Sequence, residues 1–308
     1  MSITTDLQRL LAAPETTATV VDRPAGAVLA DLPLLQDVVG VTAAGPVITN
    51  DLGPHHRPAR RGDPLRPGGA DIALRAEPDF LTTVLVTEPT AQIPPTVRFF
   101  DGDGNAAHIT YLVDGSDRLA FETLRMSRPS DVDLRDLIGD ERTIDVTARG
   151  AADDSGLPED QLALFDAILQ DCGRRRPQTL EGREGCHRVP VRAAAAALAH
   201  AALLAMPVTT CTAAPGCLQI RHDRFDGSRE HAGSMVLAAG TARTMINLNL
   251  VGQCWVTRAE GVWGPTGAIE LYDRRGRCCF VATQTGPVHP SSHDGWQDLV
   301  DDLADTRR

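Results

Sequence analysis

The sequence contains no lysine, so all 30 of its Lys and Arg residues are arginines. A catalytic Schiff base on a lysine amine is therefore excluded. Positive charge is also scarce overall, because 41 aspartates and glutamates give the 308-residue chain a net charge of −11. Proteins that bind a phosphate backbone usually present a basic face. The composition thus disfavours a nucleic-acid partner and, for the same reason, an anionic membrane surface.

Long apolar runs are missing as well. The longest, residues 193–206, is interrupted by His200 and is about six residues too short to span a membrane. The first 17 residues lack the basic-then-apolar pattern of a secretion signal. We therefore expect a soluble cytoplasmic protein without membrane insertion.

Paired cysteines and common catalytic motifs are absent too. The seven cysteines are odd in number and include no C-x-x-C pair, which disfavours a disulfide framework or a structural zinc site and predicts buried free thiols. The chain has no nucleophile elbow, no Walker loop and no G-x-G-x-x-G segment. Composition and short motifs alone leave the function open.

An internal repeat is the strongest pattern that the chain does contain. Three segments of the first half recur in the same order in the second half: residues 41–48 as 211–220, 72–75 as 246–249, and 97–104 as 269–276. The three offsets are 170, 174 and 172 residues. Three ordered matches at nearly one offset predict two copies of one structural unit.

Each copy has the pattern of an antiparallel sheet followed by a helix. The segments 101–104 and 273–276 each end in glycine between two strand-like runs, as hairpin turns do. A helix-capping signal follows each hairpin, near Ser116 and Ser292. Both copies therefore predict the order strand, turn, strand, helix.

A helical linker is predicted between the copies, with helices at residues 158–169 and 191–206. The expected fold class is α+β: an internal duplication of two antiparallel-sheet units with flanking helices and a helical linker. We place the first repeat at residues 1–128, the linker at 129–206 and the second repeat at 207–308. The cleft between the sheets and the linker is the expected ligand site.

The nine histidines are scattered through the sequence. His55 and His56 lie in a Pro/Gly/Arg-rich segment, residues 53–69, which we expect to be a mobile, solvated loop. His108 follows a hairpin on a strand, where a structural hydrogen bond is the simplest interpretation. His222 ends a strand and is expected to be exposed, whereas His200 lies in the Ala-rich helix and is expected to be a core residue. No metal-ligand spacing is evident among them.

Arg75 is the charged residue whose role is most open. It stands near the end of a predicted strand in the first copy. Its guanidinium can bind a carboxylate bidentately or bond a metal-bound anion. A surface ion pair with Asp71 or Glu77 would also account for it. The residues alone therefore predict a duplicated α+β binding protein with a central cleft.

Several segments, taken together, resemble a known family. They comprise a helix at 29–39, a hairpin-plus-helix segment at 97–121, a glycine-cysteine strand at 215–220, and the segments 253–258, 269–273 and 296–300. In this order and spacing they resemble the HmuS/ChuS/HemS family of hemin transport and hemin-degrading proteins. The resemblance extends from about residue 27 to 305, and that family is itself an internal duplication.

The resemblance implies a cytoplasmic heme-binding protein of iron acquisition, which receives heme from a heme importer and passes it to a heme oxygenase or degrades it. Heme, or a related tetrapyrrole, would lie between the second sheet and the linker helices. The family's distal arginine matches Arg75, whose guanidinium could bond iron-bound water or oxygen. Arg258, in a Trp-Val-x-Arg segment like the family's, and His108 complete the cofactor-binding residues that we predict.

Several family residues are replaced in this sequence. Ala163 stands at the linker position of the iron-ligating histidine and cannot ligate iron. Other heme contacts of the family fall at Thr49, Ala259, Val281 and Thr283. Heme without these contacts should bind weakly. Cys172, nine residues or about 2.5 helical turns after Ala163, could replace the histidine only over a long reach.

Three functions therefore remain open. The first is heme binding for trafficking or degradation, with the pocket retaining Arg75. The second is a degenerate, non-catalytic homologue that acts as a scaffold or binds another tetrapyrrole or flat ligand. The third is a heme-degrading oxidoreductase, which requires a proximal ligand and an open distal site.

Overall fold

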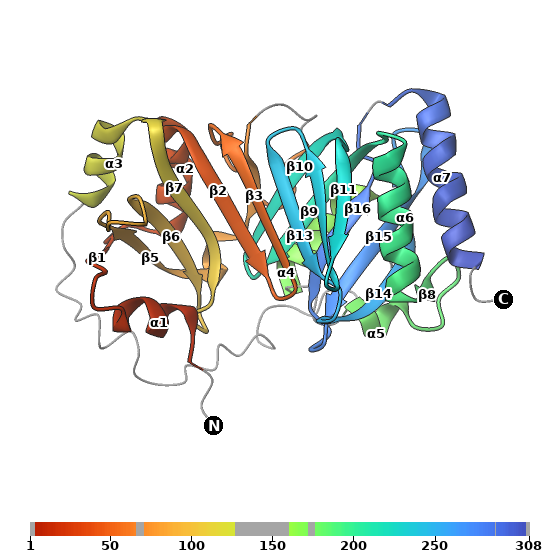
Figure 1. The fold of residues 1–308 in the computed structure, drawn as a ribbon, viewed down its shortest axis with the longest axis horizontal. Helices are drawn as coiled ribbons and strands as arrows, with labels where there is room; N and C mark the ends of the chain where they lie inside the picture. The colour runs from red at the N-terminus through yellow and green to blue at the C-terminus, as the bar shows by residue number, and fades with distance from the viewer. Residues whose placement is uncertain (1–3, 66–70, 127–159, 172–175, 287, 306–308) are drawn as a thin grey trace.

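Two antiparallel sheets organise the chain in the computed structural model (Figure 1). The structure describes residues 4–65, 71–126, 160–171, 176–286 and 288–305. All the strand pairs of the two sheets are antiparallel, and helices lie beside the sheets and at their ends. The predicted α+β class is confirmed. None of the helices in these ranges is long and apolar enough to cross a membrane.

The larger sheet has nine strands in the order β1-β5-β6-β7-β2-β3-β13-β12-β11. Strands from both halves of the chain contribute to it: β1 (Ala18–Val20), β2 (Gln36–Ala44), β3 (Val47–Gly53), β5 (Leu81–Thr87), β6 (Thr96–Asp101), β7 (Ala106–Ser116), β11 (Gly227–His231), β12 (Ser234–Ala239) and β13 (Ala242–Asn247).

The smaller sheet has seven strands in the order β4-β10-β9-β16-β15-β14-β8. It is called the second sheet below. Its members are β4 (Ala73–Ala76), β8 (His187–Val189), β9 (Pro207–Ala214), β10 (Cys217–Arg224), β14 (Val251–Gly261), β15 (Gly264–Asp273) and β16 (Cys278–Thr283).

The two copies exchange strands: β4 of the first copy joins the second sheet, whereas β11, β12 and β13 of the second copy join the larger sheet. Strand β4 of the first copy pairs with β10 of the second, and β13 of the second copy pairs with β3 of the first. Cys217 faces Ala76 in one exchange, and Val47 faces Ile246 in the other. This reciprocal register makes Ala76 and Ile246 equivalent, at an offset of 170. The offset of 174 inferred from the sequence for this segment is therefore wrong.

The strand pairing also shifts register at equivalent places in the two copies. The register shifts between Leu81 and Thr83 in β5 and between Val251 and Gln253 in β14, and again after Phe99 in β6 and after Leu271 in β15. A β-bulge is a specific feature of a strand pair and is not expected twice by chance. The shared bulges and the strand exchange bear out the internal duplication.

Helices lie around the two sheets. The α-helices are α1 (Asp6–Ala12), α2 (Ala25–Asp31), α3 (Arg118–Arg125), α4 (Gln161–Asp171), α5 (Arg176–Leu180), α6 (Val191–Leu203) and α7 (Pro290–Asp305), and two short 3₁₀ turns are η1 (Leu32–Leu35) and η2 (Pro78–Phe80). Helices α6 and α7 stand together at the right of Figure 1 and contact the second sheet.

The second sheet is apolar on both faces, as its sequence pattern requires. In β14, Cys254 and Val256 belong to the main core, which also contains apolar residues of α6 and α7. Trp255, between them, belongs to a separate apolar cluster with α4. Because side chains alternate along a strand, the linker helix α4 covers the face opposite to α6 and α7. This arrangement positions the candidate site.

One predicted helix differs from the structure. The helix expected at 29–39 ends early: α2 stops at Asp31, η1 follows with Pro33 in its first turn, and β2 begins at Gln36, whose φ of 58° turns the chain. Valines at 38 and 39 favour the strand. The linker helices at 161–171 and 191–203 agree with the predictions, whereas the proposed domain boundaries stay a prediction.

The segment predicted as a mobile loop is held in place over its described part. The backbone of residues 54–65 runs beside β4. The His56 N–H donates to the Ile72 carbonyl at 3.0 Å, and the Ala59 N–H donates to the Leu74 carbonyl at 2.9 Å. These bonds occupy the free edge of a four-residue strand, where an exposed edge would otherwise be open.

Candidate functional site

The space expected to hold a ligand between α4 and the second sheet is largely filled by side chains. Four apolar residues of α4 are buried in one cluster with residues of the second sheet, including Trp255 and Tyr272: Leu164, Phe165, Ile168 and Leu169. Helical spacing places these residues on one face. A ligand on this side of the sheet must therefore lie beyond the end of that cluster.

Arg75 lies at this end. Strand β4 places it opposite Leu218 of β10, and its side chain is only 1% exposed. Its Nε donates to the Asp166 carboxylate of α4 at 2.6 Å, and its Nη1 donates to the Asp63 carbonyl at 2.8 Å. The predicted surface ion pair with Asp71 or Glu77 is wrong, because strand exchange carries Arg75 into the second sheet and under the linker helix.

Asp166 connects three segments through one carboxylate. Besides Arg75, it accepts the N–H of Gly62 at 2.9 Å. The carboxylate therefore joins α4, β4 and the 54–65 segment. The remaining nitrogen, Nη2 of Arg75, is buried and has no hydrogen-bond partner in the described ranges. A buried guanidinium with an unused donor is suited to an anionic or hydrogen-bond-accepting ligand.

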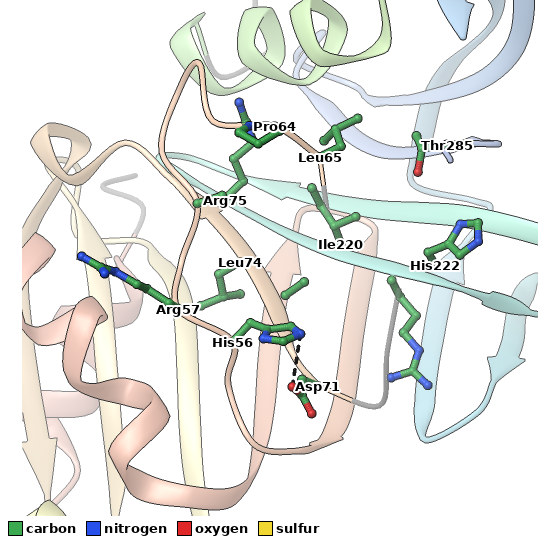
Figure 2. Close-up of a pocket in the computed structure, with 13 residues that line it drawn as sticks. His56, Arg57, Pro64, Leu65, Asp71, Leu74, Arg75, Ile220, His222 and Thr285 are labelled. Carbon is green, nitrogen blue, oxygen red and sulfur yellow. Dashed lines mark ion pairs between the residues drawn. The ribbon is translucent and has the colours of Figure 1, made fainter. Parts of the chain in front are cut away.

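A pocket adjoins this ion pair (Figure 2). The space between its walls is about 650 Å³ when the part that opens to solvent is counted. Strands β4 and β10 and the 54–65 segment supply most of its lining. The apolar members are Ala59, Pro64, Leu65, Ala73, Leu74 and Ile220, and the polar members are His56, Arg57, Asp71, Arg75, Arg221, His222 and Thr285.

His222 lies at the far end of this lining from Arg75. Leu218, Ile220 and His222 alternate along β10 and so point to one face of the sheet. Figure 2 shows Arg75, Ile220 and His222 in a row. The Nδ1 atom of His222 bonds the Thr209 hydroxyl at 2.8 Å. Partial burial lowers its pKa, which Asp223 partly offsets, and so favours the neutral ring.

His56 is on another wall of the pocket. Its Nε2 atom lies 3.1 Å from the Asp71 carboxylate, and its side chain is 39% exposed. Figure 2 marks this ion pair below the row of Arg75, Ile220 and His222. Both His55 and His56 were expected to be solvated. Neither is fully solvated, because His55 is buried and His56 is partly covered.

His108, one of the predicted cofactor-binding residues, lies in the first copy and does not line this pocket. It is fully buried, its Nδ1 bonds the Thr42 hydroxyl at 2.9 Å, and its ring packs edge-on against His55. Burial lowers the pKa of His108 to about 3. His55 bonds the Thr110 hydroxyl at 3.0 Å, and burial holds its pKa well below the usual value. The structural hydrogen bond predicted for His108 is present.

Arg258, the third predicted residue, points to the other face of the second sheet. It forms an ion pair with Asp301 and donates to the Gln297 side chain at 3.3 Å, both on α7. Helix α7 covers the face opposite to α4. The structure thus brings none of Arg75, Arg258 and His108 together, and Arg75 alone borders the pocket.

The positions where the family carries other heme contacts offer no iron ligand here. Ala163 presents only a methyl group on α4. The Thr49 hydroxyl is buried against Thr212 and Thr244, at 2.5 and 2.8 Å. Ala259, Val281 and Thr283 are buried as well. Cys172 lies outside the described residues, and the other six cysteines are free and buried, as predicted.

Two residues of this site were not predicted from the sequence. Asp166 was not considered because it lies 91 residues from Arg75 in the chain. His222 was predicted to be exposed, whereas the pocket half-buries it. The alternation of His222 with Ile220 along the strand was the one sequence signal that could have indicated a shared face. Groups of three or more potential metal-ligating side chains do not occur among the described residues.

The arrangement of the two sheets and their helices is similar to that of solved structures over nearly the whole chain. Solved structures with this fold include holo-PhuS, a heme-binding protein from Pseudomonas aeruginosa (TM-score 0.73, 20% identity, 96% of this chain and 88% of that one). Another is the heme degrading enzyme ChuS of Escherichia coli O157:H7 (TM-score 0.75, 17% identity, 96% and 89%).

Sequence comparison alone finds no relative. Neither a family profile nor a curated protein sequence matches the chain. The likeness to PhuS and ChuS is therefore one of fold, extending over nearly the whole chain. What this chain binds has to be argued from its own pocket.

Proposed function

We propose that this protein binds heme or a closely related tetrapyrrole. The observation that carries the proposal is the pocket on the linker-helix face of the second sheet, beside buried Arg75, in a fold shared with a heme-binding and a heme-degrading protein. Heme is flat and largely apolar, with two carboxylates and an iron that accepts an imidazole.

The lining residues fit such a ligand chemically. Ala73, Leu74 and Ile220 offer an apolar surface, and Arg75 offers a buried guanidinium with one unused donor. His56 and His222 supply imidazoles. Apolar walls with a few convergent polar groups are typical of cofactor sites. The pocket thus supports a tetrapyrrole, although the linker position occupied by Ala163 does not.

Trafficking is the role that we favour within this proposal, with heme received from an importer and passed to an oxygenase in the cytoplasm during iron acquisition. Degradation requires an open distal site with a hydrogen-bond donor over the iron. Here Asp166 and the Asp63 carbonyl already hold two nitrogens of Arg75. A guanidinium held in this way supports binding and transfer more than oxygen chemistry.

Titration of the purified protein with hemin tests the proposal. A sharp, saturable Soret band at one hemin per chain is expected. Leu65→Glu puts a negative charge on the pocket wall and should weaken binding, because it repels the heme carboxylates. Leu119→Glu is the matched control, since Leu119 is 77% exposed on α3, far from the pocket. A broad free-hemin spectrum, or equal effects of the two variants, would contradict the proposal.

A second candidate is a non-catalytic homologue that binds another flat ligand. The absence of a histidine at Ala163 and the closed Arg75–Asp166 pair favour it. Thermal-shift measurements with hemin, metal-free protoporphyrin and zinc protoporphyrin separate the two. A larger shift with a porphyrin that lacks iron would support this candidate over heme.

A further inference from the structure

We infer that His222 of β10 is the iron ligand of this chain, and that it takes the role that α4 cannot fill. This inference rests on the proposed heme-binding function and deepens it. It follows from the position of the imidazole in the pocket, from the hydrogen bonds that orient its ring, and from the state of the other histidines.

The position of His222 suits a flat ligand that also reaches Arg75. Leu218 is directly opposite Arg75, and His222 follows it by four residues on the same face of β10. At about 3.3 Å per residue this separates the two polar groups by roughly 13 Å along the strand. Ile220, and Ala73 opposite it, form an apolar floor between them.

The ring of His222 is oriented by hydroxyl groups on neighbouring strands. Its Nδ1 bonds Thr209, which faces it across the ladder, at 2.8 Å. The Thr209 hydroxyl in turn bonds the Thr285 hydroxyl at 2.7 Å and accepts the Thr285 N–H at 3.1 Å. Metal-ligating histidines are typically fixed through their second nitrogen in this way.

The other nitrogen of His222 is available. In the tautomer that donates from Nδ1 to Thr209, Nε2 carries the lone pair that a metal requires. Among the described residues, no group forms a hydrogen bond with Nε2. Nε2 is also not one of the polar atoms that are buried without a partner. The neutral form of the ring is the form that ligates iron.

The remaining histidines near the site are less suited. His56 also lines the pocket, but Asp71 engages its Nε2. His55 and His108 are buried against each other and against hydroxyl groups of the first copy. His56 is therefore the competing ligand, and it provides the internal comparison for an experiment.

The experiment compares hemin complexes of the wild type, His222→Ala, His56→Ala and His200→Ala. His200 is exposed on α6 and serves as the matched control. Readouts are the affinity from Soret titration, the ferric spin state by electron paramagnetic resonance, and the iron–imidazole stretch of the ferrous complex. Circular dichroism checks that each variant folds.

We expect His222→Ala alone to lose the iron–imidazole stretch and to lower hemin affinity roughly tenfold or more, since even outer partners of metal ligands cost about 10- to 100-fold. Free imidazole should restore the stretch in this variant. Thr209→Val should retain the ligand with a broadened or shifted stretch, because it removes only the bond that orients the ring.

The outcomes separate the two proposals. If the wild type shows no saturable hemin binding, the proposed function itself fails. If the wild type binds hemin with an iron–imidazole stretch that survives in His222→Ala and disappears in His56→Ala, the function stands and the assignment of His222 is overturned. The same holds if the stretch survives both substitutions.

Discussion

In the first copy His108 of β7 faces Phe99 of β6, whereas at the equivalent place of the second copy Phe280 of β16 faces Leu271 of β15. The imidazole is satisfied there by Thr42 and by further hydroxyl contacts. A phenyl ring requires no such partner. Equivalent strand pairs can therefore bury either a polar or an apolar side chain. The polar side chain requires hydroxyl partners from the neighbouring strands.

At another pair of equivalent positions, the second copy buries a charged side chain and the first copy does not. Glu270 of β15 is fully buried and accepts two bonds from Arg176 of α5, at 2.7 and 2.6 Å. Its counterpart at the offset of 172 is Arg98 of β6, which is only partly buried and bonds Thr96 of its own strand at 2.8 Å. A charge is fully buried in the copy that the linker covers, because the linker brings the partner.

The largest effect should come from breaking this pair. Glu270→Gln leaves the Arg176 guanidinium buried without a counter-charge, so we expect a loss of about 3–5 kcal/mol in the free energy of unfolding. Burial disfavours the charge of Glu270, but Arg176, Thr257 and Tyr272 hold its pKa below the usual value. Urea unfolding measures the change.

The control for this variant is Asp301→Asn. Asp301 is 56% exposed and pairs with Arg258 at the surface, where an ion pair contributes about 0–1 kcal/mol. Equal losses for Glu270→Gln and Asp301→Asn would show that the buried cluster under the linker does not differ in stability from a surface pair.

The histidine pair of the first copy predicts a pH dependence. Burial lowers the folded-state pKa of His108 to about 3, from 6.5 in the ordinary state. Between these values the unfolded chain binds a proton that the folded chain does not bind. Stability is therefore full above pH 6.5 and falls with decreasing pH, by about 1.4 kcal/mol per pH unit for this residue.

His108→Phe introduces the residue that the second copy has at the equivalent position, Phe280. The variant removes the contribution of His108 to the pH dependence. The variant loses the bond to Thr42 at every pH, but the slope of its unfolding free energy between pH 6 and 4 should decrease by about 1.4 kcal/mol per pH unit. Urea unfolding across this range measures both slopes. Parallel curves for the wild type and the variant would show that His108 is protonated in the folded protein.

Much of the secondary structure could be predicted from the sequence, because the signals for turns and helices are local. The hairpin turns at 101–104 and 273–276 contain glycines at φ of 76° and 78°, which only glycine adopts readily. The helix at 191–203 follows from its alanines. The strand exchange was not predictable in this way, because β4 has only four residues and the residues that pair with it are 141 to 147 positions away in the chain.

The candidate site was predictable only in part. Arg75 was identified, but its partner Asp166 depends on where α4 packs. His222 was expected to be exposed and is half-buried, while His200 was expected in the core and is exposed on α6. Both errors concern which face of an element meets another unit, and that is a tertiary property that a single sequence pattern leaves undecided.

Asp166→Asn tests whether the ion pair keeps the site closed. It retains a polar side chain but removes the charge opposite Arg75, so we expect a loss of about 1–3 kcal/mol by urea unfolding. With its guanidinium less strongly held, Arg75 should be available to a ligand carboxylate, and hemin affinity should rise. Unchanged or weaker hemin binding in this variant would show that the pair supports the pocket in its present form.

The smallest effect should distinguish the two helices that end the copies. Helix α3 has eight residues, and its first turn depends on the Asp117 carboxylate, which accepts the Ala120 N–H at 2.9 Å. Helix α7 is twice as long and is anchored by fully buried Trp296, whose indole N–H donates to the Gly267 carbonyl at 2.8 Å.

A short helix with few buried residues relies more on its cap than a long helix with a buried aromatic anchor. Asp117→Ala should therefore lower the free energy of unfolding by about 1 kcal/mol, measured by urea unfolding. Glu122→Ala on the exposed side of α3 is the matched control, with an expected change within about 0.5 kcal/mol. If both substitutions have the same small effect, the end of the first copy is held by packing of Phe121 and Leu124, as the end of the second copy is held by Trp296.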